Sequence, residues 1–180
     1  MNYISIFGLF VIFSNANSIP ENCREQVNRG HSKCAKPQKS IQYHYDNSLE
    51  MCLPFLYEGC GGNRNRFEDD DQCIVRCRPA DKGICGGNSK PTGSCSSRNK
   101  TCAKGSRCII MAFGIGMCYE WIRENHPKCS EPGFSVVTEP AWYGQREVLG
   151  KSCAHRFCPI GSKCIDGRWL AYCCQPIKNS

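Results

Sequence analysis

Cysteine is the residue type with the most chemistry to offer in this chain, which has 17 cysteines among 180 residues. Cysteine thiols either bind metal or oxidise to disulfides. Structural zinc sites favour paired C-x2-C ligands in a reducing cell, and no C-x2-C occurs here. We therefore interpret the cysteines as disulfides, and we expect no metal site and no cofactor. Because the total is odd, at least one thiol is unpaired or is bridged to another chain.

Other catalytic chemistry is sparse. The sequence lacks G-x-S-x-G, H-E-x-x-H, a phosphate-binding glycine motif and a calcium loop, so we expect no enzyme. Four scattered histidines read as surface or turn residues: His31, His44, His126 and His155. The net charge of +7 is spread along the chain without a dense basic run, and we expect no nucleic-acid partner.

The composition limits the size of any hydrophobic core. Leu, Ile, Val and Phe number 34, and 8 of them lie in the first 18 residues, which leaves 26 for the remaining 162. That share is about 16%, below the roughly 20% at which a chain usually buries enough apolar area to fold. Small modules closed by disulfides are therefore expected in place of one large domain.

The N-terminus predicts an exported protein. Residues 2–13 form an apolar run too short to span a bilayer, and small-x-small cleavage sites follow after Ala16 and after Ser18. We interpret residues 1–18 as a signal peptide. The mature protein is then secreted and extracellular, has no membrane association, and folds where thiols oxidise.

Charge divides the mature chain into two regions. Residues 19–80 hold 9 basic and 9 acidic residues, whereas residues 81–180 hold 14 basic and 7 acidic residues. A polar link containing Pro and Gly, near residues 78–83, marks the boundary. We expect one module at 19–80, a second at 81–120, and a linker with a third module at 121–180.

The first region predicts a hairpin followed by a helix. Tyr43 and Tyr45 alternate with polar residues, residues 46–48 can turn, and residues 52–57 can return as a second strand. Pro54 lacks an N–H group, so it should lie where that group would point out of the ladder. Residues 67–78 predict a short helix with acids in its first turn and arginines in its last.

These features together resemble a known family. The spacing C-x7-C-x12-C-x3-C, with Phe55-x-Tyr57-x-Gly59-Cys60-Gly61-Gly62-Asn63-x-Asn65-x-Phe67, closely resembles the Kunitz (pancreatic trypsin inhibitor) domain over about residues 23–77. The resemblance implies three disulfides, Cys23 with Cys77, Cys34 with Cys60, and Cys52 with Cys73. It also implies a buried Asn65 amide and a small core of Tyr45, Phe55 and Phe67.

The resemblance implies a secreted serine protease inhibitor. Kunitz domains present a rigid, substrate-like loop, here Lys33, Cys34, Ala35 and Lys36, in which the residue after the second cysteine enters the primary specificity pocket. The methyl group of Ala35 suits a shallow pocket, so an elastase-like or chymotrypsin-like protease is favoured over a trypsin-like one. The segments on either side of Cys34 are each about two residues longer than usual, and Pro37 enters the loop.

Three readings of this region stay open. The usual glycine before Cys34 is displaced to Gly30, and the segments around Cys34 are longer than usual. Both departures favour the alternative, an extracellular matrix or binding protein that uses the Kunitz fold as a non-inhibitory scaffold. Its Lys33, Lys36 and Lys39 could then face an acidic partner. A channel-blocking Kunitz domain is the third reading.

The second region repeats itself. The segment Cys102-Ala103-Lys104-Gly105-Ser106-Arg107-Cys108-Ile109 matches Cys158-Pro159-Ile160-Gly161-Ser162-Lys163-Cys164-Ile165. Both modules resemble lustrin-type cysteine-rich repeats that accompany Kunitz domains in nematode secreted proteins. The expected fold class is therefore small and disulfide-rich: a Kunitz α+β module, a β-hairpin plus a C-terminal helix, followed by two loop-rich, mostly β modules.

The two repeats differ by one cysteine. The second ends Cys173-Cys174 and the first Cys118-Tyr119, and adjacent cysteines should staple two separate elements. We predict that the odd thiol lies in the first repeat, with Cys85 as our choice, and that a disulfide-linked dimer follows if this thiol is accessible. Asn99-Lys100-Thr101 is the single glycosylation sequon.

Overall fold

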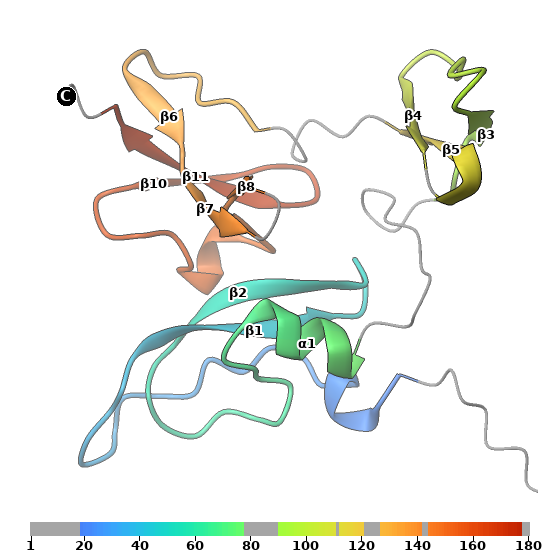
Figure 1. The fold of residues 1–180 in the computed structure, drawn as a ribbon. Coiled ribbons are helices and arrows are strands. Elements are labelled where there is room, and N and C mark those ends of the chain that lie inside the picture. Colours follow the sequence, from blue (N-terminus) through green and yellow to red (C-terminus); the bar gives the residue numbers. More distant parts are fainter. Residues whose placement is uncertain (1–18, 78–89, 111, 121–126, 142–143, 178–180) are drawn as a thin grey trace, which may run out of the picture.

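The structure is a computed structural model that describes residues 19–77, 90–110, 112–120, 127–141 and 144–177. Within these ranges the chain forms three disulfide-rich modules: the first module (residues 19–77), repeat 1 (residues 90–120) and repeat 2 (residues 127–177) (Figure 1). The predicted fold class is confirmed. The predicted signal peptide lies outside the described residues. No helix among those described is long and apolar enough to cross a membrane.

The first module contains the predicted hairpin. Strands β1 (Ser40–Asp46) and β2 (Met51–Tyr57) pair antiparallel, with a 3-10 helix, η1 (Glu21–Arg24), before them. Pro54 lies opposite Tyr43, whose backbone N–H and C=O both bond to Phe67 (2.9 Å each) instead of to β2. A proline at this position therefore costs the ladder no hydrogen bond, as the sequence predicted.

The helix of the first module is shorter than predicted. We expected residues 67–78, but α1 spans Asp70–Cys77. The Asp69 carboxylate accepts the Gln72 N–H at 2.8 Å, so Asp69 caps the helix, while Phe67 is held in a bridge to Tyr43. Two disulfides fix α1: Cys52–Cys73 to β2 and Cys23–Cys77 to η1.

Repeat 1 is a three-stranded antiparallel sheet. It consists of β3 (Gly93–Ser96), β4 (Ser106–Ile110) and β5 (Ile115–Glu120), in the order β3-β5-β4, with a 3-10 turn η3 (Ala112–Gly114) joining β4 to β5. Disulfides Cys95–Cys108 and Cys102–Cys118 close it.

Repeat 2 is built around a similar central hairpin with added strands. Strands β10 (Lys163–Asp166) and β11 (Ala171–Pro176) form the hairpin, and β6 (Phe134–Val136) and β9 (Leu149–Gly150) both pair with β11. A separate hairpin joins β7 (Thr138–Ala141) to β8 (Gly144–Glu147), and a 3-10 turn η5 (Cys153–His155) follows β9. The core is formed by Val137, Val148, Phe157, Ala171 and Cys173.

The disulfides of the two repeats share one connectivity. Cys153–Cys164 and Cys158–Cys173 of repeat 2 join the same positions as the two bridges of repeat 1, and repeat 2 adds Cys129–Cys174. The adjacent Cys173 and Cys174 therefore staple two different elements, as predicted.

Candidate protease-binding loop and its supports

The candidate binding loop is open to solvent. All residues from 31 to 40 are exposed, including the four predicted contact residues: Lys33, Cys34, Ala35 and Lys36. Disulfide Cys34–Cys60 joins the loop to the segment after β2, and the three bridges of the first module are those that the family resemblance implies. The loop projects from one end of the first module, at the lower left of Figure 1.

Backbone contacts hold the base of the loop. His31 and Cys60 exchange two backbone hydrogen bonds, of 2.8 and 3.0 Å, which form an isolated β-bridge. The His31 Nδ1 atom also accepts the Lys33 N–H at 3.2 Å. The start of the loop is therefore fixed at two points within four residues of Ala35, and this reduces the entropy lost on binding.

Two glycines let the backbone segments pass close together. Gly30 has φ +67°, and a Cβ there would lie 2.2 Å from the Cys60 carbonyl oxygen. Gly59 has φ +108°, and a Cβ there would lie 2.5 Å from the Gln38 nitrogen and 2.8 Å from Pro37. Only glycine fits either position. Gly30 and Pro37, which we read in the sequence as departures from the family, thus pack against the loop's support.

Ion pairs of Glu58 connect the loop, the segment that supports it and repeat 2. Its carboxylate pairs with Arg29 at 2.5 Å, with Lys39 at 3.0 Å and with Arg156 of repeat 2 at 3.9 Å. The hydrogen bond from Lys39 is the largest cause that lowers the pKa of Glu58. Arg29 also donates to the carbonyl oxygen of Ala154 in η5 at 3.1 Å, so one side chain connects both modules.

Asn65 organises the interior of the first module. Its side chain is fully buried, its Oδ1 accepts the Tyr45 N–H at 2.9 Å, and its Nδ2 donates to the carbonyl oxygens of Tyr45 (2.9 Å) and Glu25 (2.6 Å). Phe55 and Tyr45 are buried, and Phe67 is half-buried against the cluster that contains Tyr45. Because several buried backbone groups depend on one amide, Asn65 fixes how the hairpin meets the N-terminal segment.

Repeat 2 packs directly on the hairpin of the first module. Leu170 of repeat 2 is buried with Leu49 and Leu53 of the first module, and partly buried apolar residues surround them: Met51, Leu149 and Trp169. Lys151 donates to Ser48 at 2.8 Å at the edge of this contact, and Arg146 pairs with Asp70 of α1. The first module and repeat 2 are therefore neighbours in space (Figure 1).

Two histidines meet at this contact. His44 is 2% exposed, and its ring contacts the rings of Phe55 at 5.7 Å and His155 at 5.5 Å. Burial is the main cause that lowers the pKa of His44 to about 4, and the nearby His155 lowers it further. Burial likewise lowers the pKa of His155. Our interpretation of His44 as a surface residue was wrong, because the docked repeat 2 covers it.

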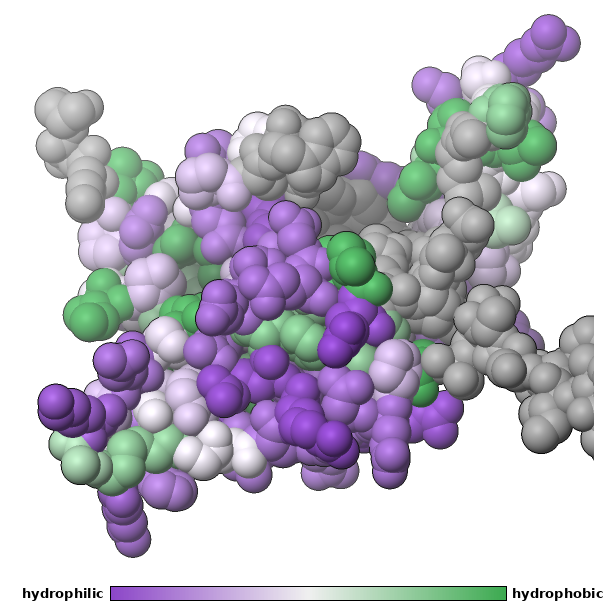
Figure 2. Space-filling model, turned by 60° about the horizontal axis from the view of Figure 1, so that its bottom comes forward, coloured by the Kyte–Doolittle hydropathy of each residue, from purple (hydrophilic) through white to green (hydrophobic). Residues whose placement is uncertain are grey.

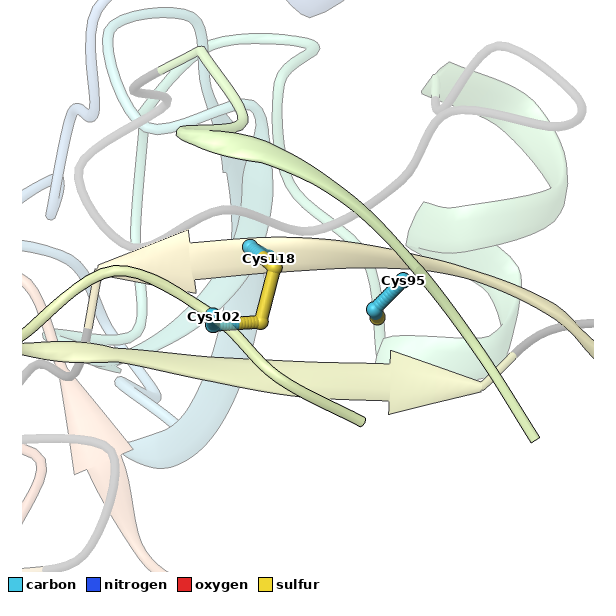
Figure 3. A group of neighbouring side chains, drawn as sticks. All are labelled: Cys95, Cys102 and Cys118. Atoms are coloured by element: carbon cyan, nitrogen blue, oxygen red, sulfur yellow. A yellow bond between two sulfur atoms is a disulfide. The ribbon is translucent and has the colours of Figure 1, made fainter. Parts of the chain in front are cut away.

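The cluster that most resembles a metal site is made of disulfides. Cys95, Cys102 and Cys118 have their sulfur atoms within 4.8 Å of one another (Figure 3). Cys102 is bonded to Cys118, and Cys95 to Cys108. Disulfide sulfur is not the thiolate that binds zinc, so oxidised repeat 1 offers no thiolate ligand at this point.

Two predicted modification sites fall in or beside repeat 1. Asn99 is exposed between β3 and β4, where its Oδ1 accepts the Thr101 N–H at 3.1 Å.

Cys85 lies outside the described residues. The eight disulfides use the other 16 cysteines, so none of those can be the partner of Cys85 within this chain.

Comparison with known proteins identifies the family. The Kunitz/Bovine pancreatic trypsin inhibitor domain matches residues 22–78. A BPTI/Kunitz inhibitor domain-containing protein of Caenorhabditis elegans is 39% identical over 160 residues, which are 85% of this chain and 89% of the relative. The chain belongs to the BPTI/Kunitz inhibitor family. This family is non-enzymatic, and the first module is its Kunitz domain.

Further relatives cover different parts of this Kunitz protein. Major allergen Ani s 1 of Anisakis simplex is 33% identical over 150 residues, 76% of each chain, and so extends beyond the Kunitz domain. Kunitz-type serine protease inhibitor 2 of Naja nivea is 49% identical over 35 residues, 19% of this chain and 61% of the relative. The Caenorhabditis elegans and Anisakis simplex relatives are both nematode proteins.

Sequence reasoning missed the supports that come from repeat 2. The charged residues involved are isolated in the sequence, with no spacing that would link them: Arg29, Glu58, Lys151 and Arg156. The Glu58 carboxylate collects cations that are 29, 19 and 98 residues away in the chain. Arg29 and Lys39 reach Glu58 within the Kunitz domain, whereas only the docking of repeat 2 brings Arg156 to Glu58 and Lys151 to Ser48.

Proposed function

We propose that the mature chain is a secreted serine protease inhibitor whose binding loop consists of Lys33, Cys34, Ala35 and Lys36. One observation carries the proposal: Ala35 is exposed in a loop whose base is held by a disulfide, a β-bridge and the close packing of two glycines. A loop whose freedom is already lost on folding binds with a smaller entropic cost.

The proposed targets are elastase-like or chymotrypsin-like proteases. Ala35 would enter the primary specificity pocket, and its methyl group fills a shallow pocket without supplying the cation that a trypsin-like pocket pairs with its carboxylate. Secretion rests on the signal-like residues 1–18 and on eight disulfides, which need an oxidising compartment. A glycan at Asn99 and a disulfide-linked dimer through Cys85 belong to the same proposal.

An inhibition panel tests the proposal. The full mature chain is titrated into elastase-, chymotrypsin- and trypsin-like enzymes, and the proposal predicts submicromolar inhibition of at least one of the first two, at least tenfold stronger than that of the trypsin-like enzyme. If none of the three is inhibited at micromolar concentration, the Kunitz domain is a non-inhibitory scaffold and the alternative of a binding or matrix protein replaces this proposal.

A further inference from the structure

The hairpins of the two repeats have equivalent positions at their tips. Ile110 pairs with Gly116 in repeat 1, and Asp166 pairs with Ala171 in repeat 2. Ile115 and Leu170 directly precede these last paired residues, so they are equivalent. Leu170 is 3% exposed because it inserts between Leu49 and Leu53 of the Kunitz domain, whereas Ile115 is 61% exposed. In repeat 2 this tip is a docking element.

The tip of repeat 1 carries apolar side chains that its own chain leaves exposed. Phe113 is 98% exposed and has φ +60°, a conformation that an L-residue with a bulky side chain seldom adopts. Ile109 and Met117, a directly opposed pair, are also exposed on the sheet behind it. Figure 2 shows hydrophobic residues gathered on repeat 1, at the upper right. Exposed patches of this kind mark interaction sites.

Repeat 1 is also basic. Its described residues hold five cations and a single acid: Lys90, Arg98, Lys100, Lys104 and Arg107 against Glu120. Arg98 lies beside the tip, because the N–H of its neighbour Ser97 donates to the Gly114 carbonyl oxygen at 2.9 Å. The surface that would accept this tip should therefore combine apolar contact with negative charge.

A groove with these two properties lies between the first module and repeat 2. It has a volume of about 560 Å³ and lies between the start of β2, α1 and the β7–β8 hairpin. Its apolar lining comes from Met51, Leu53, Pro54, Ile74 and Leu149, and its charged lining is five acids and one base: Glu50, Asp70, Asp71, Glu139, Glu147 and Arg146. None of residues 33–36 lines it, so the candidate binding loop stays free when the groove is filled.

We propose that the apolar tip of repeat 1 docks into the acidic groove of a second copy of this chain. The hairpin supplies Phe113 and Ile115 to the apolar lining, and the basic module faces the acidic rim. Because tip and groove are different surfaces of one chain, the contact is heterologous, and a pair of copies joined by one such contact keeps one free tip and one free groove. Association should therefore continue beyond a dimer and display several inhibitor loops on one assembly.

Sedimentation of the mature chain tests this proposal. With Cys85 changed to Ser to exclude covalent dimers, the weight-average mass should rise with concentration up to about 1 mM, without a plateau at the dimer, and should fall on added salt. Phe113→Ser should weaken the association at least tenfold. The matched control is Ile160→Ser, which removes an equally exposed apolar side chain from repeat 2 and should change nothing.

Charge reversal tests the groove separately. Asp71→Lys should weaken association several-fold at low salt, while Glu21→Lys, an exposed acid outside the groove, should not. All variants are made in one secreting host so that any glycan at Asn99 is common to them.

Three results would overturn the proposal. The first is a monomer at every concentration. The second is a Phe113-dependent change in compactness at constant mass, which would place the tip in the groove of its own chain. The third is Phe113-dependent pelleting of the monomer with phosphatidylserine vesicles, which would assign the tip to an anionic lipid surface.

Discussion

Tyr119 occupies in repeat 1 the strand position that Cys174 holds in repeat 2. Tyr119 lies opposite Arg107, next to the opposed pair Cys108 and Cys118. Cys174 lies opposite Lys163, next to the opposed pair Cys164 and Cys173. Cys174 is bonded to Cys129, the first cysteine of its repeat. The exchange of one cysteine for tyrosine thus accounts for the odd total of 17.

This equivalence predicts that Tyr119→Cys restores a missing bridge. The new cysteine should bond Cys85, because Cys129 and Cys174 bond at the corresponding positions. Maleimide labelling in denaturant, followed by mass spectrometry, should find one free or intermolecular thiol in the parent and none in the variant. Ser135→Cys, on an exposed strand position, is the control and should add a reactive thiol. An unpaired cysteine mapped outside residues 85–118 would contradict the assignment.

The two disulfides at the ends of the Kunitz domain should differ in their importance for folding. Cys23–Cys77 is buried and closes the longer loop, with a sequence separation of 54, whereas Cys34 is exposed and its bridge spans 26. Each bridge contributes about 2 to 4 kcal/mol, and the buried pair also fills the core. Replacing both Cys23 and Cys77 by Ala should leave the domain largely unfolded at 37 °C in circular dichroism melts.

The matched variant removes Cys34 and Cys60 in the same way. It should still melt cooperatively, because the lost bridge closes a shorter loop and its Cys34 end is exposed, but it should inhibit its protease more weakly because the binding loop gains freedom. A cooperative melt only a few degrees below the parent after loss of Cys23 and Cys77 would show that the core, and not the bridge, holds the domain.

Acid should destabilise the docked structure through His44. Its pKa falls from an ordinary 6.5 to about 4 in the folded protein, so the unfolded state binds the proton more tightly. The stabilisation from neutral His44 is fully present above pH 6.5 and is lost as the pH falls towards 4. This contribution to the free energy of unfolding is on the order of 3 kcal/mol. His44→Phe should flatten the dependence of the melting temperature on pH between 4 and 6.5, although His155 keeps part of it.

His31→Phe is the control for this titration, since His31 is exposed in the loop. It should leave the pH dependence as in the parent. An unchanged pH dependence in His44→Phe would show that His44 is not buried as a neutral ring by repeat 2.

Leu170 should be the residue of repeat 2 on which docking most depends. Leu170→Ala empties the apolar contact with Leu49 and Leu53, and a buried leucine of this kind is worth about 2 to 5 kcal/mol. Ile165→Ala, at a 36% exposed position of the same hairpin, should cost far less. Amide hydrogen exchange is the measurement, and faster exchange of β2 in Leu170→Ala alone is expected. Equal effects of the two changes would contradict the docking described.

The sequence predicts more of the modules than of their arrangement. Local patterns locate the hairpin, the place of Pro54 and the repeat of cysteines, because each depends on neighbours along the chain. The predicted start of the helix is wrong by three residues because Asp69 caps the helix, and residue spacing does not reveal which residue is the cap. The contact of His44 with His155 and the ion pair of Glu58 with Arg156 join residues about 100 positions apart, for which one sequence carries no periodic signal.

The most direct test of the inhibitor proposal is the change Ala35→Lys in the full mature chain. If Ala35 enters the specificity pocket, the lysine supplies the missing cation, and inhibition should shift towards the trypsin-like enzyme by at least two orders of magnitude relative to the elastase-like one. The control is Ala103→Lys, the same change on the exposed surface of repeat 1, which should leave both inhibition constants unchanged. If Ala35→Lys alters neither constant while the parent inhibits, the protease contact lies elsewhere and the assigned loop is wrong.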